Sequence, residues 1–240
     1  MRIAVLSDIH SNLAALEAVL GDLPTVHEAW VLGDIVGYGP QPNEVIRTLQ
    51  ALGARSVLGN HDGAAVGTVD ADPFNPDARR AIDWTAQVID PNARSYLGTL
   101  PEVRREGQMT AVHGSPRDPI WEYIFSEEVA AQNLAAFDTP LCLFGHTHVP
   151  IVYAADEDDV APLPSVPDTP IALDGRRALV NPGSVGQPRD GNPAASYLIL
   201  DTDEGNIQFR RVRYDIERTQ RLMLDAGLPL RLVERLSYGL

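Results

Sequence analysis

The stretch IAVLSDIH, residues 3–10, contains the pattern from which the fold is predicted. Its first four residues are apolar and are followed at once by Ser7 and Asp8, which is typical of a short buried strand that ends in a loop. Asn12 is then placed to cap a helix through Leu20, because apolar side chains recur there at helical spacing. A strand followed so closely by a helix predicts the start of a βαβ unit.

The same alternation continues through the first half of the chain. Strands are predicted at residues 29–32 and 55–58, with a helix at residues 42–52 between them. Residues 76–100 are predicted to be helical, with Pro91 dividing them into two helices, because proline disrupts a helix interior. Strands that alternate with helices indicate an α/β fold.

The second half of the chain contains more strands and fewer helices. Short strands are predicted at residues 109–112, 141–144, 151–154, 171–173, 178–180, 195–200 and 207–213, and a helix at residues 126–137. Residues 156–170 are acidic and rich in proline, which is typical of a surface loop, and residues 216–240 are predicted to form a helical tail. Because no repeat and no linker separates these elements, we expect residues 1–240 to form a single domain.

Composition favours a soluble protein that binds neither nucleic-acid duplexes nor membranes. The 240 residues carry 33 acidic and 19 basic side chains, a formal net charge of −14, and such a surface repels phosphate backbones and anionic lipids. Asp8 and His10 interrupt the first apolar run too early for a signal peptide, and no run approaches the roughly 20 residues of a membrane span. We therefore expect a cytoplasmic location, which the single cysteine, Cys142, also fits.

Polar side chains with metal-ligand character follow the predicted strands, at the position where α/β folds place their sites. Asp8 and His10 follow the first strand, and Asp34 follows the second. The other members are Asn60, His61 and Asp62 after the third strand, His113 after residues 109–112, and His146 and His148 after residues 141–144. Any one of them alone could be a helix cap or a structural histidine, but five separate blocks together predict a metal site.

These blocks, in this order, resemble the signature of the calcineurin-like metallophosphoesterases. The matching segments are Asp8-Ile9-His10, Gly33-Asp34, Gly59-Asn60-His61-Asp62, His113-Gly114 and Gly145-His146-Thr147-His148. The chain is similar to the bacterial single-domain phosphodiesterase and phosphatase branch also at residues 37–40, 113–117 and 181–186. The resemblance implies a four-layer α/β/β/α sandwich, in which two mixed sheets pack face to face with helices outside.

The resemblance also implies a ligand role for most of these residues. One metal ion would be held by Asp8, His10 and His148 and the other by Asn60, His113 and His146, with Asp34 bridging them. Oxygen and imidazole ligands without thiolate suit manganese, which we expect as the cofactor, and they also suit Fe, Zn, Ni or Co. Two divalent cations about 3.5–4 Å apart would activate a bridging hydroxide to attack the phosphorus.

His61 is the candidate catalytic residue, because in this family the histidine of the Gly-Asn-His-Asp block faces the substrate and protonates or stabilises the leaving oxygen. Asp62 is expected to orient the His61 imidazole and to favour its cationic form. Arg117 and Arg189 are candidates for binding the substrate phosphate, since a guanidinium matches phosphate oxygens bidentately.

The surroundings of the blocks lead to three smaller expectations. Tyr38, Trp121 and Tyr123 either line a substrate cleft or pack in the core, and Cys142, within an apolar run, is predicted to pack in the core. Because free imidazole protonates near pH 6.5, metal binding and activity are expected to fall below about that pH.

The sequence therefore predicts a phosphoric ester hydrolase that uses two divalent metal ions and acts on a small phosphate ester. A phosphodiester is the preferred substrate, because compact bacterial relatives often act on diesters; the alternative is a phosphomonoesterase, a protein phosphatase or a diadenosine-tetraphosphatase-like hydrolase. A retromer subunit uses the same fold as a scaffold but lacks the catalytic histidine, whereas His61 is present here. A DNA nuclease of the family would need a basic region, which nothing after residue 190 provides.

Overall fold

The computed structural model describes residues 1–156 and 159–240, in which twelve strands form two sheets. The strands are β1 (Arg2–Leu6), β2 (Glu28–Val31), β3 (Arg55–Ser56), β4 (Val103–Glu106), β5 (Met109–Val112), β6 (Leu141–Leu143), β7 (Pro150–Asp156), β8 (Asp159–Leu163), β9 (Pro170–Ala172), β10 (Ala178–Pro182), β11 (Ala195–Asp201) and β12 (Asn206–Val212). The helices are α1 (Leu13–Asp22), α2 (Pro42–Leu52), α3 (Asn60–Val66), α4 (Pro76–Val88), α5 (Pro91–Leu97), α6 (Glu127–Leu134), α7 (Ile216–Asp225) and α8 (Leu230–Arg235).

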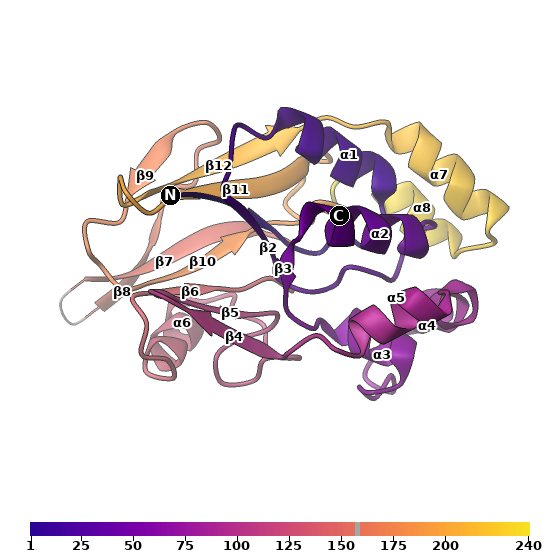
Figure 1. The fold of residues 1–240 in the computed structure, drawn as a ribbon, viewed down its shortest axis with the longest axis horizontal. Helices are drawn as coiled ribbons and strands as arrows, with labels where there is room; N and C mark the ends of the chain where they lie inside the picture. Colours follow the sequence, from indigo (N-terminus) through magenta and orange to yellow (C-terminus); the bar gives the residue numbers. More distant parts are fainter. Residues whose placement is uncertain (157–158) are drawn as a thin grey trace.

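Both sheets are mixed, and each contains three mutually parallel strands. The first sheet has the order β3-β2-β1-β11-β12-β9, in which β1, β2 and β3 are parallel. The second has the order β4-β5-β6-β10-β7-β8, in which β5, β6 and β10 are parallel. The sheets pack face to face, with α1 beyond the first sheet and α6 beyond the second (Figure 1). This arrangement confirms the predicted four-layer sandwich.

The alternation of side chains along β1 shows why the sheets are layered in this way. Ile3 and Val5 belong to the apolar core between the two sheets, whereas Ala4 and Leu6 belong to the core under α1, α2 and α5. Successive side chains of a strand point to opposite faces, so a strand covered on both faces must be apolar throughout. The third core lies between the second sheet and α6 and contains Cys142, as predicted; burial raises the pKa of its thiol.

Most of the predicted elements are confirmed, and helix α2 has the predicted bounds. The side chain of Asn12 accepts a hydrogen bond from the backbone amide of Ala15 and so caps α1 as expected. The short helix α3 and the strand β4 were not predicted, because α3 contains glycine and β4 is a largely charged strand at the edge of its sheet.

The prediction of a surface loop at residues 156–170 is wrong in part. Strand β8 occupies residues 159–163 and pairs antiparallel with β7, with Val152 opposite Leu163. Because β8 is the edge strand of its sheet, acidic residues and a proline are tolerated in it. Residues 157 and 158 of the predicted loop lie outside the described residues.

The two helices of the C-terminal segment pack against α4 and the loop that contains Tyr38. Tyr38, Met223 and Leu236 belong to one buried apolar cluster, and the Thr219 hydroxyl donates to the Asn12 side chain at 2.9 Å. The segment is therefore attached to the loops that follow β1 and β2. None of the helices in the described part of the chain is long and apolar enough to cross a membrane.

Candidate metal centre

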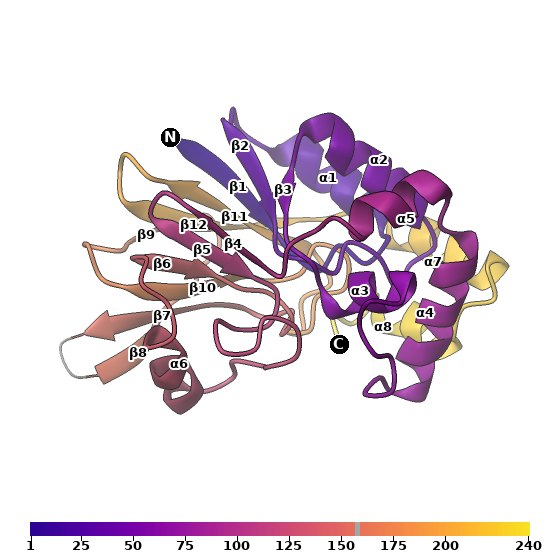
Figure 2. The same ribbon diagram turned by 60° about the horizontal axis from the view of Figure 1, so that its bottom comes forward.

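The candidate ligands lie in loops at the carboxyl ends of the parallel strands of both sheets. These loops gather between the sheets and the helices α3 and α8 (Figure 2). The ligands predicted from the sequence are all at most 3% exposed: Asp8, His10, Asp34, Asn60, His113, His146 and His148. The topology thus brings together residues that are up to 140 positions apart in the sequence.

Five of these seven residues have a left-handed backbone, which is unusual for residues other than glycine. The φ angles are 52° at Asp8, 49° at His10, 49° at Asp34, 65° at His146 and 61° at His148. Each such residue costs about 1–3 kcal/mol, so the conformation persists only where surrounding contacts enforce it. Strain of this kind is concentrated at functional sites, and here it occurs at the residues whose side chains converge.

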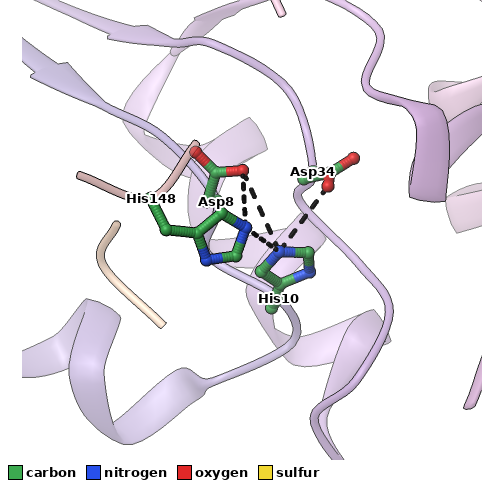
Figure 3. Close-up of side chains that lie close together, drawn as sticks. All are labelled: Asp8, His10, Asp34 and His148. Carbon is green, nitrogen blue, oxygen red and sulfur yellow. Dashed lines mark hydrogen bonds and ion pairs between the residues drawn. The ribbon is translucent and has the colours of Figure 1, made fainter. Parts of the chain in front are cut away.

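The first group of converging side chains consists of Asp8, His10, Asp34 and His148 (Figure 3). The Nε2 atoms of His10 and His148 are 3.2 Å apart. His148 Nε2 is 3.2 Å from an Asp8 carboxylate oxygen, and His10 Nε2 is 3.6 Å from an Asp34 oxygen. All four side chains are buried.

The hydrogen bonds of the two imidazoles determine which nitrogen faces the centre of this group. His10 Nδ1 lies 3.1 Å from the Val36 carbonyl and His148 Nδ1 lies 2.6 Å from the Gln187 carbonyl. Because a carbonyl can only accept, each Nδ1 carries the proton and each Nε2 presents a lone pair. The group therefore contains two imidazole lone pairs and two carboxyl groups that face one another, which is an arrangement that a cation suits.

The second group consists of Asp34, His113 and His146, and Asp34 is the member common to both groups. His113 Nδ1 lies 2.8 Å from the Leu32 carbonyl, so by the same argument its Nε2 presents a lone pair. That Nε2 is 3.0 Å from His146 Nδ1 and 3.5 Å from an Asp34 carboxylate oxygen. The shared carboxylate is placed where a residue that bridges two cations would have to lie.

The Asn60 side-chain amide lies beside the second group and can face it by either end. With its oxygen inward it places an acceptor 3.0 Å from His113 Nε2. With its nitrogen inward it donates to both Asp34 carboxylate oxygens at 3.2 Å and to His113 Nε2 at 3.0 Å. A cation among these residues favours the oxygen-inward orientation, since only that end of an amide is a metal ligand.

The backbone of the loop after β2 lies very close to the backbone of the loop after β3, and two glycines allow this approach. A Cβ atom on Gly59 would lie 2.2 Å from the Asp34 backbone nitrogen, and one on Gly33 would lie 2.7 Å from the Gly59 nitrogen. Gly33 also has a φ of 83°, which glycine adopts at no steric cost. These contacts bring Asp34 and Asn60 toward the same point.

Asp62 does not orient His61 as predicted. Its two carboxylate oxygens accept hydrogen bonds from the backbone amides of Val36 at 3.0 Å and Gly59 at 3.1 Å. Burial raises the pKa of Asp62 to about 6, while the hydrogen bonds from Val36 and Gly59 act in the opposite direction. Because the Val36 carbonyl faces His10 Nδ1, Asp62 supports the ligand His10 through the backbone of Val36.

The His61 ring is held instead by aromatic packing and by a glycine. Its ring centroid is 4.3 Å from that of Tyr38 and 4.7 Å from that of Phe74. A Cβ atom on Gly37 would lie 2.3 Å from His61 Nδ1, which within the described residues has no hydrogen-bond partner. The His61 backbone amide donates to Asp34 at 2.9 Å, so the ring is anchored to the carboxylate shared by both groups.

The segment 181–187 supports ligands from both sheets. The Ser184 hydroxyl donates to the Asp8 carbonyl at 2.8 Å, and the Asn181 amide donates to the Gly145 carbonyl at 2.6 Å. With the Gln187 carbonyl facing His148, this segment positions ligands and does not itself join either group. The sequence marked the segment by its resemblance, but the contact made by Gln187 had no sequence signal.

A cavity of about 800 Å³ opens beside the two groups, and Asp34, Asn60, His61, His146 and His148 form part of its wall. Tyr38, Trp121 and Tyr123 line it as well. Trp121 and Tyr123 are therefore cleft residues, whereas Tyr38 lines the cavity and also belongs to a buried apolar cluster. Figure 2 shows α3, α4 and α8 around the same region. The remaining wall includes side chains of α8, which were not predicted to take part in the site.

Only one of the two arginines that are predicted to bind phosphate lines the cavity. Arg189 lines the cavity; its guanidinium donates to the Gln187 side chain at 3.1 Å, and its Nε atom is buried without a partner within the described residues. Arg117 does not line the cavity, because its guanidinium is directed to Gln132 and to Glu122, the latter at 3.6 Å. The structure therefore does not bring Arg117 to the cavity that Arg189 lines.

Burial also determines the protonation of the imidazoles. It lowers the pKa of His10, His61, His113 and His146 below the usual imidazole range and that of His148 to about 4. The expected cationic form of His61 is therefore not favoured. Burial, with the negative charges of Asp8 and Asp62, raises the pKa of Asp34 well above its usual value. The imidazoles are thus neutral at pH 6.5, and Asp34 is the ligand that holds a proton most readily.

The lowered pKa values of the imidazoles predict how many protons the protein releases when it binds metal. Four free imidazoles with a pKa of about 6.5 would be half protonated at pH 6.5 and would release about two protons. Because the pKa values of the four ligand histidines are lowered, we expect them to release almost none, and Asp34 at most one. Calorimetric titration of the metal-free protein with MnCl₂ at pH 6.5, in buffers of different ionisation enthalpy, measures this number. A release of two protons or more would contradict the prediction. It would mean that metal binding weakens below about pH 6.5, as free imidazole would require.

Two groups of buried acceptors that share a carboxylate, beside an arginine-lined cavity in a four-layer sandwich, define the class of protein as a metal-dependent hydrolase of phosphoric esters. A family profile described as "Calcineurin-like phosphoesterase superfamily domain" matches residues 1–205. The chain belongs to the calcineurin-like phosphoesterase superfamily, whose members use divalent metal ions.

Similar proteins cover the whole chain or part of it. The uncharacterized protein MJ0912 of Methanocaldococcus jannaschii is 39% identical over 245 residues, which cover 99% of this chain and 98% of that protein. The crystal structure of a metallophosphoesterase from Sphaerobacter thermophilus is 49% identical with a TM-score of 0.92, covering 100% of this chain and 99% of that one. A symmetrical bis(5'-nucleosyl)-tetraphosphatase of Shewanella baltica is 31% identical over 142 residues, 52% of this chain and 47% of that protein.

Proposed function

We propose that the chain hydrolyses phosphodiesters with two divalent cations, of which manganese is the first choice. One cation would be held by Asp8, His10 and His148, the other by Asn60, His113 and His146, with Asp34 between them. The observation that carries this proposal is that two buried groups of carboxylate and imidazole side chains share the Asp34 carboxylate. Imidazole and carboxylate donors suit manganese, and they suit iron, zinc, nickel or cobalt on the same grounds.

The bound cations would polarise the phosphoryl oxygens and lower the pKa of a water molecule. The protein's own side chains then bind and orient the ester. Arg189 faces the cavity with free guanidinium donors and is suited to hold a phosphoryl oxygen. His61 also lines the cavity, and as a neutral imidazole it can donate an N–H hydrogen bond to the leaving oxygen.

Asp62 is assigned a positioning role in this proposal. Its carboxylate holds the Val36 and Gly59 amides and thereby the Val36 carbonyl that faces His10 Nδ1 and the loop that precedes Asn60. Partners of metal ligands affect metal affinity by roughly 10- to 100-fold when they are removed. Asp62 therefore acts through the ligands and does not touch the substrate.

The shape and lining of the cavity favour a diester over a monoester. A diester has two organic substituents, and a cavity of about 800 Å³ has room for both beside the metal groups. Phe74, Trp121 and Tyr123 offer aromatic surface to such substituents, and the centroids of Phe74 and Trp121 are 5.3 Å apart in an edge-to-face contact. The similarity to the Shewanella baltica protein makes a dinucleoside polyphosphate the alternative substrate.

We also propose that residues 1–240 act as one domain in which residues 216–240 complete the site. The support is that Leu232 lines the cavity and belongs to the same apolar cluster as Tyr38. A wall of the cavity thus depends on the C-terminal helices, beyond the residues that the family profile matches.

Two chromogenic substrates test the preference for diesters. With MnCl₂ present, we expect kcat/KM for bis(p-nitrophenyl) phosphate to exceed that for p-nitrophenyl phosphate at least about tenfold, because only the diester uses both sides of the cavity. The chelator-treated protein is the control and should be inactive with either substrate. A preference for the monoester would contradict the proposed phosphodiesterase activity and indicate a phosphomonoesterase. No turnover of any phosphate ester by the metal-loaded protein would favour a scaffold.

A further inference from the structure

Three arginines line the cavity although the protein has a net charge of −14. Arg189 comes from the loop before β11, and Arg231 and Arg235 come from α8. Within the described residues, none of these guanidiniums forms an ion pair with a side-chain carboxylate, although Asp77 and Glu234 also line the cavity. The Arg235 Nε atom donates to the main-chain oxygen of Leu240, which lines the same cavity. Elsewhere on the chain, Arg117, Arg211 and Arg221 each have a carboxylate partner. No side-chain carboxylate of the described residues therefore pairs with the positive charges at the cavity.

These positive charges lie in the wall of the same cavity. Burial, with the charges of Arg189 and Arg231, lowers the pKa of Arg235 to about 10, and Tyr38 acts in the opposite direction. Arg189 also lies over the Tyr38 ring, 5.9 Å from its centroid. Like charges held together without a counter-charge repel, so an anion between them would be bound favourably.

The helix that carries Arg231 and Arg235 is held in place by several hydrogen bonds. The Gln220 amide donates to the Val233 carbonyl at 2.8 Å and to the Ser237 hydroxyl at 2.9 Å. The Gly191 amide donates to the Gly239 carbonyl at 2.9 Å, and a Cβ atom on Gly239 would lie 2.6 Å from the Asn192 backbone. The two arginines are therefore presented to the cavity by a fixed element.

We propose that Arg231 and Arg235 form a second anion-binding site, which takes a further phosphate of the substrate while its scissile phosphate lies at the metal groups. The substrate class is then a phosphodiester with an additional phosphate on one of its organic substituents. This proposal rests on the proposed function, because the two anions are assumed to belong to one substrate. Each guanidinium offers up to five N–H donors in a planar fork that matches phosphate oxygens.

A matched pair of substrates tests the second site. Thymidine 5′-(p-nitrophenyl phosphate) is compared, with and without a 3′-phosphate, on the manganese-loaded wild type and on the Arg231→Gln/Arg235→Gln variant. We expect kcat/KM of the variant to fall about tenfold or more for the 3′-phosphorylated substrate, and less than about threefold for the other. Arg221→Gln is the control, because it removes one positive charge from α7 outside the cavity, as Arg231→Gln does within it. It should change neither value.

Equal losses for both substrates, or no loss for either, would overturn the second site. If the double variant does not fold, the same two kcat/KM values are measured for the single variant Arg231→Gln. Because Arg231 is exposed, its replacement should leave the fold intact. If the wild type hydrolyses neither substrate, the proposed function fails, and calorimetric binding of thymidine 3′,5′-bisphosphate and thymidine 5′-monophosphate still tests the site. The bisphosphate should bind more tightly to the wild type and lose that advantage in the variant; an equal advantage in both proteins would refute the proposal.

Discussion

Replacement of Asp34 by asparagine is expected to prevent the protein from holding two metal ions and to lower turnover by at least about 10³-fold. Asp34 lies 3.6 Å from His10 Nε2 and 3.5 Å from His113 Nε2, and it belongs to both groups of candidate ligands. The substitution removes a negative charge from between two cations that repel one another. The loss of several kcal/mol of transition-state stabilisation corresponds to this factor.

Metal content after gel filtration, measured with turnover, tests this prediction. The metal-free Asp34→Asn protein should be at least as stable as the wild type, because the substitution removes a buried carboxylate close to Asp8 and Asp62. It should also gain less thermal stability than the wild type when manganese is added. Cys142→Ala is the control: it should cost on the order of 1 kcal/mol of stability and leave metals and turnover nearly unchanged. Binding of two metals with wild-type affinity by Asp34→Asn would show that Asp34 is not the bridge.

Replacement of His61 by alanine is expected to lower kcat by roughly 10²–10³-fold while both metals stay bound. The His61 ring lines the cavity, but neither group of candidate ligands includes it. Removal of one donor that stabilises developing negative charge has this usual magnitude. Burial lowers the pKa of His61 well below its usual value, so we expect it to act as a hydrogen-bond donor and not as an imidazolium acid.

Metal content and the dependence on the leaving group distinguish this role from the alternatives. The loss should be smaller for p-nitrophenyl esters than for alkyl esters, because nitrophenolate needs less stabilisation as it leaves. His27→Ala is the matched control, since His27 is exposed and bonds to the Arg2 backbone at the start of β1. Loss of a metal from His61→Ala would make His61 a ligand in place of Asn60. An unchanged kcat with every active substrate would exclude a catalytic role for His61 and strengthen the scaffold alternative.

The residues of the candidate centre were predictable because each follows a strand within a short block of its own. Asp8 and His10, for example, follow an apolar run of four residues, and this local pattern needs no knowledge of the rest of the chain. The structure brings every predicted ligand into one of two groups or beside one, as for Asn60. Their ligation of metal stays a prediction.

The expected contacts of Asp62 and Arg117 depended on where a side chain points, and the structure directs both side chains elsewhere. Adjacency in sequence suggested that Asp62 orients His61, yet the start of α3 directs the carboxylate to the Val36 and Gly59 amides. Arg117 lies next to a matching block, yet its guanidinium is directed to Gln132 and Glu122. Neighbouring residues on a turn or a helix point in different directions, so sequence distance does not determine contact.

From the sequence alone, the alternation of strands and helices predicted an α/β fold, because periodicity is a local property. The family, the layered arrangement and the seven ligand roles followed from the resemblance of short motifs, which are also read without tertiary contacts. Only the tertiary structure decided the tautomers of His10, His113 and His148, since these depend on carbonyls of other loops. It alone also placed Arg231 and Arg235 at the cavity. In sequence these arginines belong to an ordinary amphipathic helix, and charges on such a helix are usually solvated. Their role depends on the packing of α8 against the Tyr38 loop, a long-range contact that no local pattern encodes.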